Sequence, residues 1–417
     1  MKRALKVGML SLGCPRNLTD SEVILGQLRA KGCAVVDIDK AEVGIVNTCS
    51  FIKDAKAESI EAILDLIELK KEGRLKKIIV AGCLTQRYGD TLRRELPEVD
   101  AFVGKFALGP GGAKRFAITP GHYAYLKICE GCVNNCSFCI IPRIKGRFVS
   151  LGPEHILREA RRLDAQRIAE LNVIGQDICG WGLDLYKTRK LPVLLQRLAA
   201  GLRHTRWIRL LYLYPHPVIK EVLIVMQDEP KFCRYIDLPI QHVNDRILRL
   251  MNRRTSKADI LRLIQAVRKK IPDAAIRTCL IVGFPSETDR QFRELLEFVK
   301  EARFERLGVF MYSREEGTPA YRFKPQVPDS RKAERFNMIM AEQQKISQQL
   351  NARWLGRELE VLIDEARTDA YLARSQYDAP EVDGNVYVHS KRKLKAGDFV
   401  KVKITDTLEY DLVGEAC

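Results

Sequence analysis

The sequence predicts an α/β protein in three parts: an N-terminal parallel sheet, a larger parallel α/β region and a small antiparallel β-barrel. Strand and helix patterns alternate from residue 4 to about 105 and again from 123 to 353, which favours parallel strands covered by helices. After about residue 355, short alternating strands lie between glycines and polar turns, which is typical of a small antiparallel barrel. The 417 residues are enough for two to three domains.

Composition and charge narrow the class of protein. Hydrophobic residues make up 46% and charged residues 29% of the chain, as in an ordinary soluble protein. No apolar run reaches the roughly 18 residues that span a bilayer, and the N-terminus lacks a signal-peptide pattern, so we expect a cytoplasmic protein. In that compartment the 12 cysteines favour metal or catalytic use over disulfides. The net charge of +17 fits nucleic-acid contact and a solvated basic surface equally well.

The first domain is predicted to contain three short buried strands that each run into a cysteine. The strands are predicted at 5–12, 43–46 and 77–80, and the cysteines that follow them are Cys14, Cys49 and Cys83. Because the carboxyl ends of parallel strands meet at one edge of a sheet, where such sheets bind ligands, we expect the three thiols to converge and to hold a cluster. The alternative is three small buried hydrophobic side chains. Cys33 fits no such pattern and is assigned to the core.

A glycine- and proline-rich linker is predicted at 106–120, and a series of strand–helix units follows it. Six strands are predicted, at 123–128, 169–174, 207–213, 235–240, 275–282 and 307–312. Helices are predicted between them, and a long polar helix at 330–353 ends the region. Together these elements predict a parallel barrel, open or closed, with its functional residues at the carboxyl ends of the strands.

A cysteine-rich loop follows the first of these strands. Cys132, Cys136 and Cys139 are separated by three and then two residues. Three thiolates so close in sequence can hold three corners of an iron–sulfur cube and leave one iron open for chemistry. Zinc is the alternative, since Cys129 adds a second Cys-x-x-Cys pair, but structural zinc sites usually separate their pairs by about a dozen residues. We therefore expect a cluster and assign Cys129 to the core.

The last module combines short strands with a mildly acidic charge. Its strands are predicted at 361–364, 386–389, 399–404 and 410–413. From 356 to 417, Asp and Glu number 13 and Lys and Arg 9, a net charge of −4, which leaves +21 for the preceding 355 residues. A surface that grips RNA should be basic, because phosphate contacts dominate affinity, so the charge favours a basic protein partner. A basic stretch at 391–393 stays available for RNA.

The cysteine loop, with Phe138 before its last cysteine, resembles that of the radical S-adenosylmethionine (SAM) superfamily. The flanking sequence is similar to one branch, the methylthiotransferases, and the similar stretches are 11–17, 47–49, 81–83, 207–215, 238–242 and 282–288. The last module resembles a TRAM domain. The resemblance covers essentially the whole chain. It implies a partial barrel of six βα units in the centre and domains at 1–118, 119–350 and 351–417.

Within this family the sequence is most similar to the RimO branch, which modifies a ribosomal protein, rather than to the MiaB branch, which modifies transfer RNA. The similarity lies in 11–17, in Gln241-His242 and in 378–384. The sequence departs from the branch at positions where other residues are common, and these are Cys129, Lys145, Leu151 and Cys279. The departures leave the cluster cysteines intact and bear on the contacts to SAM and substrate.

The resemblance implies a reaction that adds a methylthio group to the β-carbon of an aspartate in small-subunit ribosomal protein twelve. It implies two 4Fe–4S clusters, one on Cys132, Cys136 and Cys139 and one on Cys14, Cys49 and Cys83. It also implies SAM, an electron donor such as flavodoxin or ferredoxin, and a sulfur donor. Two alternatives stay open. One is methylthiolation of a modified adenosine beside the tRNA anticodon, and the other is a non-enzymatic iron–sulfur protein that binds RNA or senses redox state.

No catalytic residue is expected beyond the cluster ligands. Phe138 is expected to pack near the adenine of SAM. Residues at predicted carboxyl strand ends are expected to line the SAM site, and these are Gln176, Asp177, Gln241 and the turn that contains Gly283 and Glu287. His216 and His242 are candidates for proton carriers.

Overall fold

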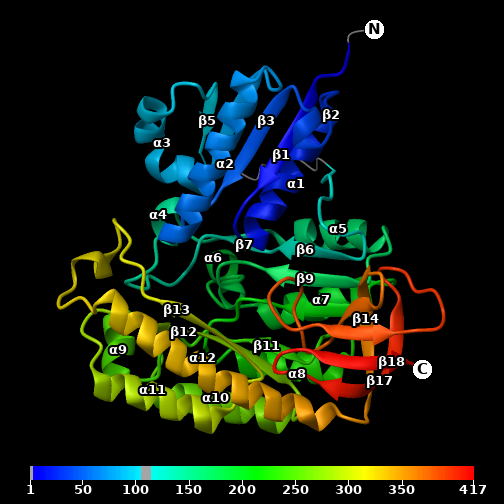
Figure 1. The fold of residues 1–417 in the computed structure, drawn as a ribbon. Helices are drawn as coiled ribbons and strands as arrows, with labels where there is room; N and C mark the ends of the chain where they lie inside the picture. Colours follow the sequence, from blue (N-terminus) through cyan, green and yellow to red (C-terminus); the bar gives the residue numbers. More distant parts are fainter. Residues whose placement is uncertain (1–2, 105–113) are drawn as a thin grey trace. The chain divides into compact units, whose positions relative to one another are not determined.

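The computed structural model describes residues 3–104 and 114–417 (Figure 1). The described chain forms two compact units. The first combines the region up to Thr119 with Cys139–Arg147 and Glu315–Thr318, and the second comprises the rest. Most of the linker predicted at 106–120 lies outside the described residues. Among the described helices, none is both long enough and apolar enough to span a membrane.

The first unit is built on a parallel sheet, which confirms the predicted α/β domain. The strand order is β2 (Ala34–Val35), β1 (Lys6–Ser11), β3 (Val43–Thr48), β4 (Lys77–Gly82) and β5 (Ala101–Val103). The helices between strands are α1 (Pro15–Ala30), α2 (Lys53–Lys71) and α3 (Cys83–Glu95). In α2, Ile63, Leu66 and Ile67 share one buried face, as expected for a helix that covers a sheet. The register pairs Ser11 with Asn47, so neighbouring strands end level.

The second unit contains six parallel strands. They are β6 (Tyr123–Lys127), β9 (Glu170–Ile174), β10 (Trp207–Leu210), β11 (Tyr235–Asp237), β12 (Ala275–Val282) and β13 (Arg306–Met311). They form two sheets, β6-β9-β10 and β11-β12-β13, which a bridge between Ile208 and Phe232 joins. Within the described residues, β6 and β13 are the edge strands, so the predicted parallel barrel is an open one.

Helices follow the strands of this barrel and pack on them. They are α5 (Pro153–Asp164), α7 (Leu191–Gly201), α8 (Ile219–Asp228), α9 (Asp245–Leu250), α10 (Lys257–Lys270), α11 (Asp289–Ala302) and α12 (Asp329–Asn351). Local sequence explains the start of α11, where Thr288 and Gln291 form a capping box. Phe292, Leu295 and Val299 then recur at helical spacing and enter the core.

Two of the barrel strands are shorter than their apolar sequences predicted. β10 ends at Leu210 rather than at residue 213, and β11 ends at Asp237 rather than at residue 240. Tyr212 adopts a left-handed backbone conformation with φ of 64°, which interrupts the predicted extension of β10. Gln241, with φ of 70°, turns the chain just after the segment predicted for β11. The apolar residues remain buried, because the strand extensions continue as irregular backbone inside the barrel.

The last module is a closed barrel of five strands, drawn in orange and red in Figure 1. The strands are β14 (Glu358–Ala366), β15 (Tyr371–Ser375), β16 (Val386–His389), β17 (Phe399–Thr407) and β18 (Leu412–Ala416). All neighbours pair antiparallel except β16 and β18, which pair parallel. The sequence did not predict β15, because Arg374 and Ser375 are polar residues that are nevertheless buried.

Buried ion pairs connect this small barrel to the parallel strands of the second unit. Glu170 accepts hydrogen bonds from Arg209 Nε and pairs with Arg374 Nη1, both at 2.7 Å. Arg374 Nε also donates to Asp364 Oδ2 at 2.7 Å. The side chains of Glu170 and Arg209 have no solvent exposure. The two arginines lower the pKa of Glu170 despite the opposing effect of burial, which keeps the carboxylate charged.

Carboxylates of residues 378–384 also bind side chains of the parallel strands. Arg306 Nε donates to Asp378 Oδ1 at 2.9 Å, and the Tyr235 hydroxyl donates to Asp383 Oδ2 at 2.5 Å. The Tyr123 hydroxyl donates to Glu381 at 2.7 Å. These carboxylates are therefore directed at the parallel strands, and the net charge of −4 overstates the negative charge that the module presents to a partner.

Replacing Glu170 by glutamine is expected to lower the free energy of unfolding of the second unit by about 3–5 kcal/mol, because two buried guanidinium groups lose their shared carboxylate. Glu360→Gln is the matched control, since Glu360 pairs with Arg206 at an exposed position and the shift should be much smaller. Denaturant titration followed by circular dichroism measures both. Equal small shifts in the two variants would contradict a stabilising role for the buried network.

Candidate active site

The three cysteines of the first unit follow the carboxyl ends of its three central strands. Cys14 precedes α1 directly, Cys49 follows β3, and Cys83 is the first residue of α3. The thiols share close neighbours, since Gly13, directly before Cys14, lies against Cys49, and Cys83 Sγ donates to Asn17 Oδ1 at 3.8 Å, three residues after Cys14. The predicted convergence of these side chains is therefore present in the structure.

Gly13 allows the backbone before Cys14 to lie against the side chain of Cys49. Its φ is +85°, and a Cβ at this position would lie 2.7 Å from Cys49 Cβ and 2.9 Å from Cys49 Sγ. No side chain fits there without moving Cys49. The glycine in the sequence Leu-Gly-Cys thus has a steric function that its motif alone does not explain.

Burial and neighbouring charges act on the three thiols differently. Burial raises the pKa of Cys83 to about 12, although the Lys145 ammonium partly opposes it. Burial also raises the pKa of Cys49. At Cys14 burial has the same tendency, but the Arg16 guanidinium and the backbone N–H of Asn17 outweigh it and lower the pKa. Thiols that are buried together in this way become stable thiolates when a metal centre binds them.

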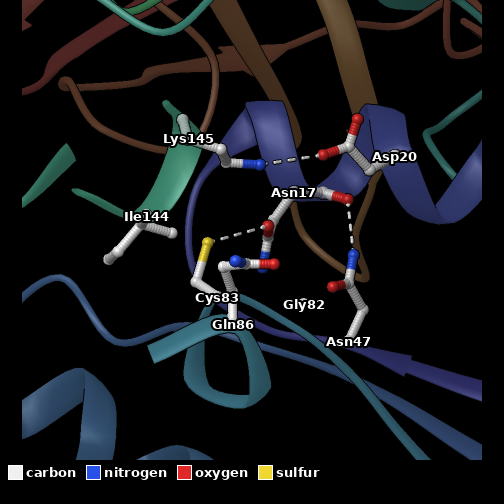
Figure 2. Close-up of a pocket in the computed structure, with 8 residues that line it drawn as sticks. All are labelled: Asn17, Asp20, Asn47, Gly82, Cys83, Gln86, Ile144 and Lys145. Carbon is white, nitrogen blue, oxygen red and sulfur yellow. Dashed lines mark hydrogen bonds and ion pairs between the residues drawn. The ribbon is translucent and has the colours of Figure 1, made fainter. Parts of the chain in front are cut away.

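Two asparagines hold the strand ends in place, and Figure 2 shows both beside Cys83. Asn17 Nδ2 donates to the carbonyl oxygens of Leu12 and Thr48, each at 2.9 Å. Asn47 Nδ2 donates to the Asn17 carbonyl oxygen at 2.9 Å. Neither asparagine could be assigned a role from the sequence alone. Their position inside the two cysteine motifs was the available signal.

A short helix after the cysteine-rich loop completes this pocket. α4 (Ile141–Lys145) packs Ile144 against Cys83, and Lys145 Nζ lies 3.2 Å from Asp20 Oδ2 (Figure 2). Lys145 is one of the departures from the RimO pattern. It is buried, and its positive charge acts on Cys83.

Replacing Gly13 by alanine is expected to displace Cys49 and to lower the iron content of the reconstituted chain from about eight to about four atoms. Gly32→Ala is the matched control. Gly32 has a similar φ of +86°, but a Cβ there would meet nothing within 4 Å. The two alanine substitutions therefore impose similar backbone strain, and only Gly13→Ala also places a methyl group against a cysteine. Iron and sulfide analysis after reconstitution measures the effect. Eight irons in Gly13→Ala would show that Cys49 is not needed in this position.

The second cysteine set lies on one loop. Cys132 and Cys136 belong to the second unit, and Cys139 begins the segment Cys139–Arg147 that groups with the first. Cys132 Sγ accepts from the backbone N–H of Asn134 at 3.4 Å, and Asn134 Nδ2 donates to Asp177 Oδ2 at 2.7 Å. Burial and the Asp177 carboxylate raise the pKa of Cys132 to about 11. Burial also raises the pKa of Cys136, which the Arg253 guanidinium opposes.

Among the described residues, no three His, Cys, Asp or Glu side chains are arranged to hold a single metal ion.

Four of the residues expected at the SAM site come from strand ends of the second unit. Gln176 and Asp177 follow β9, Gln241 lies beyond β11, and Gly283 follows β12. Gln176 Nε2 donates to Glu130 Oε1 at 3.1 Å, and its own Oε1 is buried without a hydrogen-bond partner. Asp177 is buried, and burial raises its pKa. Gln176 is therefore the residue of this group that carries an unused acceptor.

The other two residues expected at the SAM site, Glu287 and Phe138, contact neighbouring groups of the protein. Glu287 is buried, and its carboxylate accepts from the backbone N–H groups of Gly283 and Phe284 and pairs with Arg335 at 3.2 Å. These bonds hold the turn after β12, so Glu287 shapes the site through the backbone. Phe138 packs against the aromatic cluster around Phe284.

Neither histidine has the features of an exposed proton carrier. His242 is fully buried, and its Nδ1 accepts from the backbone N–H groups of Val243 and Asn244 at 2.9 Å. Burial, helped by the Arg189 charge, lowers the pKa of His216 to about 4, so its imidazole is neutral at pH 7.

The other departures from the RimO pattern are packing positions. Cys129 is buried and donates to the Asp177 carbonyl oxygen at 3.7 Å. Cys279 is buried beside Arg277. The Leu151 carbonyl oxygen accepts from Trp181 Nε1 at 3.0 Å, and its side chain packs on the main core.

Comparison with known proteins covers all three parts of the chain. Residues 6–104 match the family described as UPF0004, an uncharacterized protein family, residues 126–299 match the radical SAM superfamily, and residues 355–417 match the TRAM domain. The ribosomal protein uS12 methylthiotransferase RimO of Thermoanaerobacter sp. (strain X514) is 48% identical over 98% of this chain and 99% of its own length. The chain belongs to the RimO family of methylthiotransferases. The equivalent protein of Geobacter sulfurreducens is 45% identical over 98% of each chain.

Family membership makes the chain a radical SAM enzyme that transfers a sulfur-containing group, works with SAM and holds an iron–sulfur cluster. Solved structures agree on the fold. The radical SAM methyltransferase TsrM of Kitasatospora setae superposes with a TM-score of 0.57 at 14% identity and covers 77% of both chains. The cobalamin-dependent enzyme OxsB with SAM bound gives a TM-score of 0.51 at 11% identity and covers 82% of this chain and 56% of its own.

Proposed function

We propose that this enzyme adds a methylthio group to the β-carbon of an aspartate in ribosomal protein uS12 and uses two 4Fe–4S clusters to do so. The near full-length similarity to proteins named for that activity supports the substrate. The observation that supports the second cluster is that Cys14, Cys49 and Cys83 follow the carboxyl ends of three neighbouring parallel strands, with Gly13 against Cys49 and Cys83 bonded to Asn17. A radical SAM enzyme that only cleaved SAM would need a single cysteine set.

Cys132, Cys136 and Cys139 would hold the cluster that cleaves SAM reductively and so supplies the radical that removes an unactivated hydrogen. Around it, Gln176, Asp177, Gln241 and Gly283 would bind SAM, and Phe138 would pack near its adenine. Glu287 would act by fixing the turn at Gly283. The Oε1 of Gln176, which is buried without a hydrogen-bond partner, would accept from a donor of the ligand.

Cys14, Cys49 and Cys83 would hold the second cluster, whose open iron would carry the sulfur to be methylated and transferred. Asn17 and Asn47 keep the three strand ends together, and α4 covers Cys83. The proposal includes domains at 1–118, 119–350 and 351–417, a cytoplasmic location, an electron donor such as flavodoxin or ferredoxin, and a separate sulfur donor.

Mass spectrometry of uS12 and of total tRNA from a deletion strain tests the substrate. We expect uS12 to lose its methylthio group, tRNA to keep its own, and a plasmid copy of the gene to restore the modification. Loss from tRNA alone would assign the enzyme to the modified adenosine beside the anticodon. Reduced, reconstituted protein that released no 5′-deoxyadenosine from SAM would contradict an enzymatic function of either kind.

A further inference from the structure

The segment that ends α9 is bonded to the loop that carries Cys136. The backbone N–H of Ser137 donates to the Met251 carbonyl oxygen at 2.9 Å, and the Ser137 hydroxyl donates to the Leu250 carbonyl oxygen at 2.7 Å. On the other side of Cys136, Asn252 Nδ2 donates to the Asn135 carbonyl oxygen at 2.7 Å. Both neighbours of Cys136 are therefore fixed by residues more than a hundred positions later in the chain.

The next residue, Arg253, faces the cysteine itself. It is 7% exposed, and its Nη1 lies 4.0 Å from Cys136 Sγ in donor geometry. Its Nη2 donates to the Pro239 carbonyl oxygen at 2.7 Å, and its guanidinium lies over the Tyr214 ring at 4.4 Å. Asn252 has a φ of 53°, and this left-handed residue turns the chain after α9.

Among the described residues, Arg253 forms no ion pair with a carboxylate at contact distance, and its Nε is buried without a hydrogen-bond partner. Burying a guanidinium in this way is costly, and a negative group bound at Cys136 would offset that cost. A 4Fe–4S cluster on three thiolates is such a group, because the ligands outweigh the charge of its core and reduction adds one more negative charge.

We propose that Arg253 is a positioning residue for the cluster on Cys132, Cys136 and Cys139 and that it raises the reduction potential of that cluster. The inference rests on the proposed function, which places a cluster there. A cation and a hydrogen-bond donor beside a ligating sulfur favour the state that carries the extra electron. Arg253 thereby favours the one-electron reduction on which SAM cleavage depends.

The test uses the full-length chain with Cys14, Cys49 and Cys83 replaced by alanine, so that one cluster gives the signal. Electron paramagnetic resonance follows its reduction by dithionite at controlled potentials. We expect Arg253→Gln to make reduction about tenfold less favourable, a shift of about 59 mV to lower potential for one electron. Arg253→Lys keeps the charge and should shift the potential less. Arg254→Gln is the matched control, because Arg254 is adjacent but exposed, and it should leave the potential unchanged.

Iron analysis distinguishes a failure of the inference about Arg253 from a failure of the proposed cluster. A parent chain that bound about four irons, with a potential that neither Arg253→Gln nor Arg253→Lys changed, would overturn this inference and leave the proposed function standing. A parent that bound no iron would overturn the proposed cluster and the inference with it. If Arg253→Gln lost its iron, the Arg253→Lys potential would decide. A shift relative to Arg254→Gln supports the inference, and equality overturns it.

Discussion

Replacing Cys132 by alanine is expected to lower 5′-deoxyadenosine formation from SAM by more than about 100-fold. Loss of outer-shell partners of a metal site already costs about 10- to 100-fold, and Cys132 is a proposed ligand itself. Its sulfur has two contacts with Asn134, which also binds Asp177, so the loop is organised around this position. Liquid chromatography of reactions with dithionite and SAM measures the product.

The matched control is Cys129→Ser. Cys129 lies three residues earlier and is also buried, but its thiol is bonded to a backbone carbonyl group. We expect this variant to keep its cluster and to produce 5′-deoxyadenosine at a rate close to that of the unmodified chain. Equal losses in the two variants would mean that the loop is sensitive to any change and that Cys132 has no special role.

Replacing Cys49 by alanine is expected to separate the two halves of the reaction. Methylthiolated uS12 should fall by more than about 100-fold, while 5′-deoxyadenosine formation continues, because the loop cysteines are unchanged. Mass spectrometry of uS12 and chromatography of the same reaction measure both products. The control is Cys33→Ala, since Cys33 packs at the other end of the sheet core and should affect neither product. Loss of both products in Cys49→Ala would contradict a separate role for the second cluster.

Much of the fold was predictable because its signals are local. Hydrophobic periodicity and capping residues act within a few positions, so the parallel sheet, the parallel barrel and the small β-barrel were all identified. β15 was missed because Arg374 is buried by Glu170, about two hundred residues earlier. The early end of β10 depends on the left-handed residue Tyr212, whose side chain gives no sequence signal for that conformation.

The candidate site also contains residues that could be predicted from the sequence and residues that could not. The six cysteines could be proposed as cluster ligands from the sequence because they repeat a pattern, three after strands and three on one loop. Arg253, Asn17 and Lys145 were not, because their roles depend on neighbours far away in sequence. In the sequence, Arg253 is one of several basic residues at a helix end, and only the structure shows its contact with Cys136. Lys145 reads as a departure from a family pattern until its contact with Asp20 is known.

The structure also changes the interpretation of the net negative charge of the last module. Its negative balance favoured a basic protein target when only composition was considered. Asp378 and Asp383 bind Arg306 and Tyr235 of the parallel barrel, whereas Asp364 binds Arg374 within the small barrel, so these carboxylates stabilise the second unit. Similarity to uS12 methylthiotransferases, rather than this charge, therefore supports the proposed substrate.

An iron and sulfide count on anaerobically reconstituted full-length protein tests whether the chain holds two clusters. Two cubanes predict about eight irons and eight sulfides per chain, with Mössbauer spectra that assign all the iron to 4Fe–4S centres. The Cys14, Cys49, Cys83 triple alanine variant should retain about four of each. About four irons in the unmodified chain would contradict the presence of two clusters, because the three strand-end cysteines would then hold no cluster.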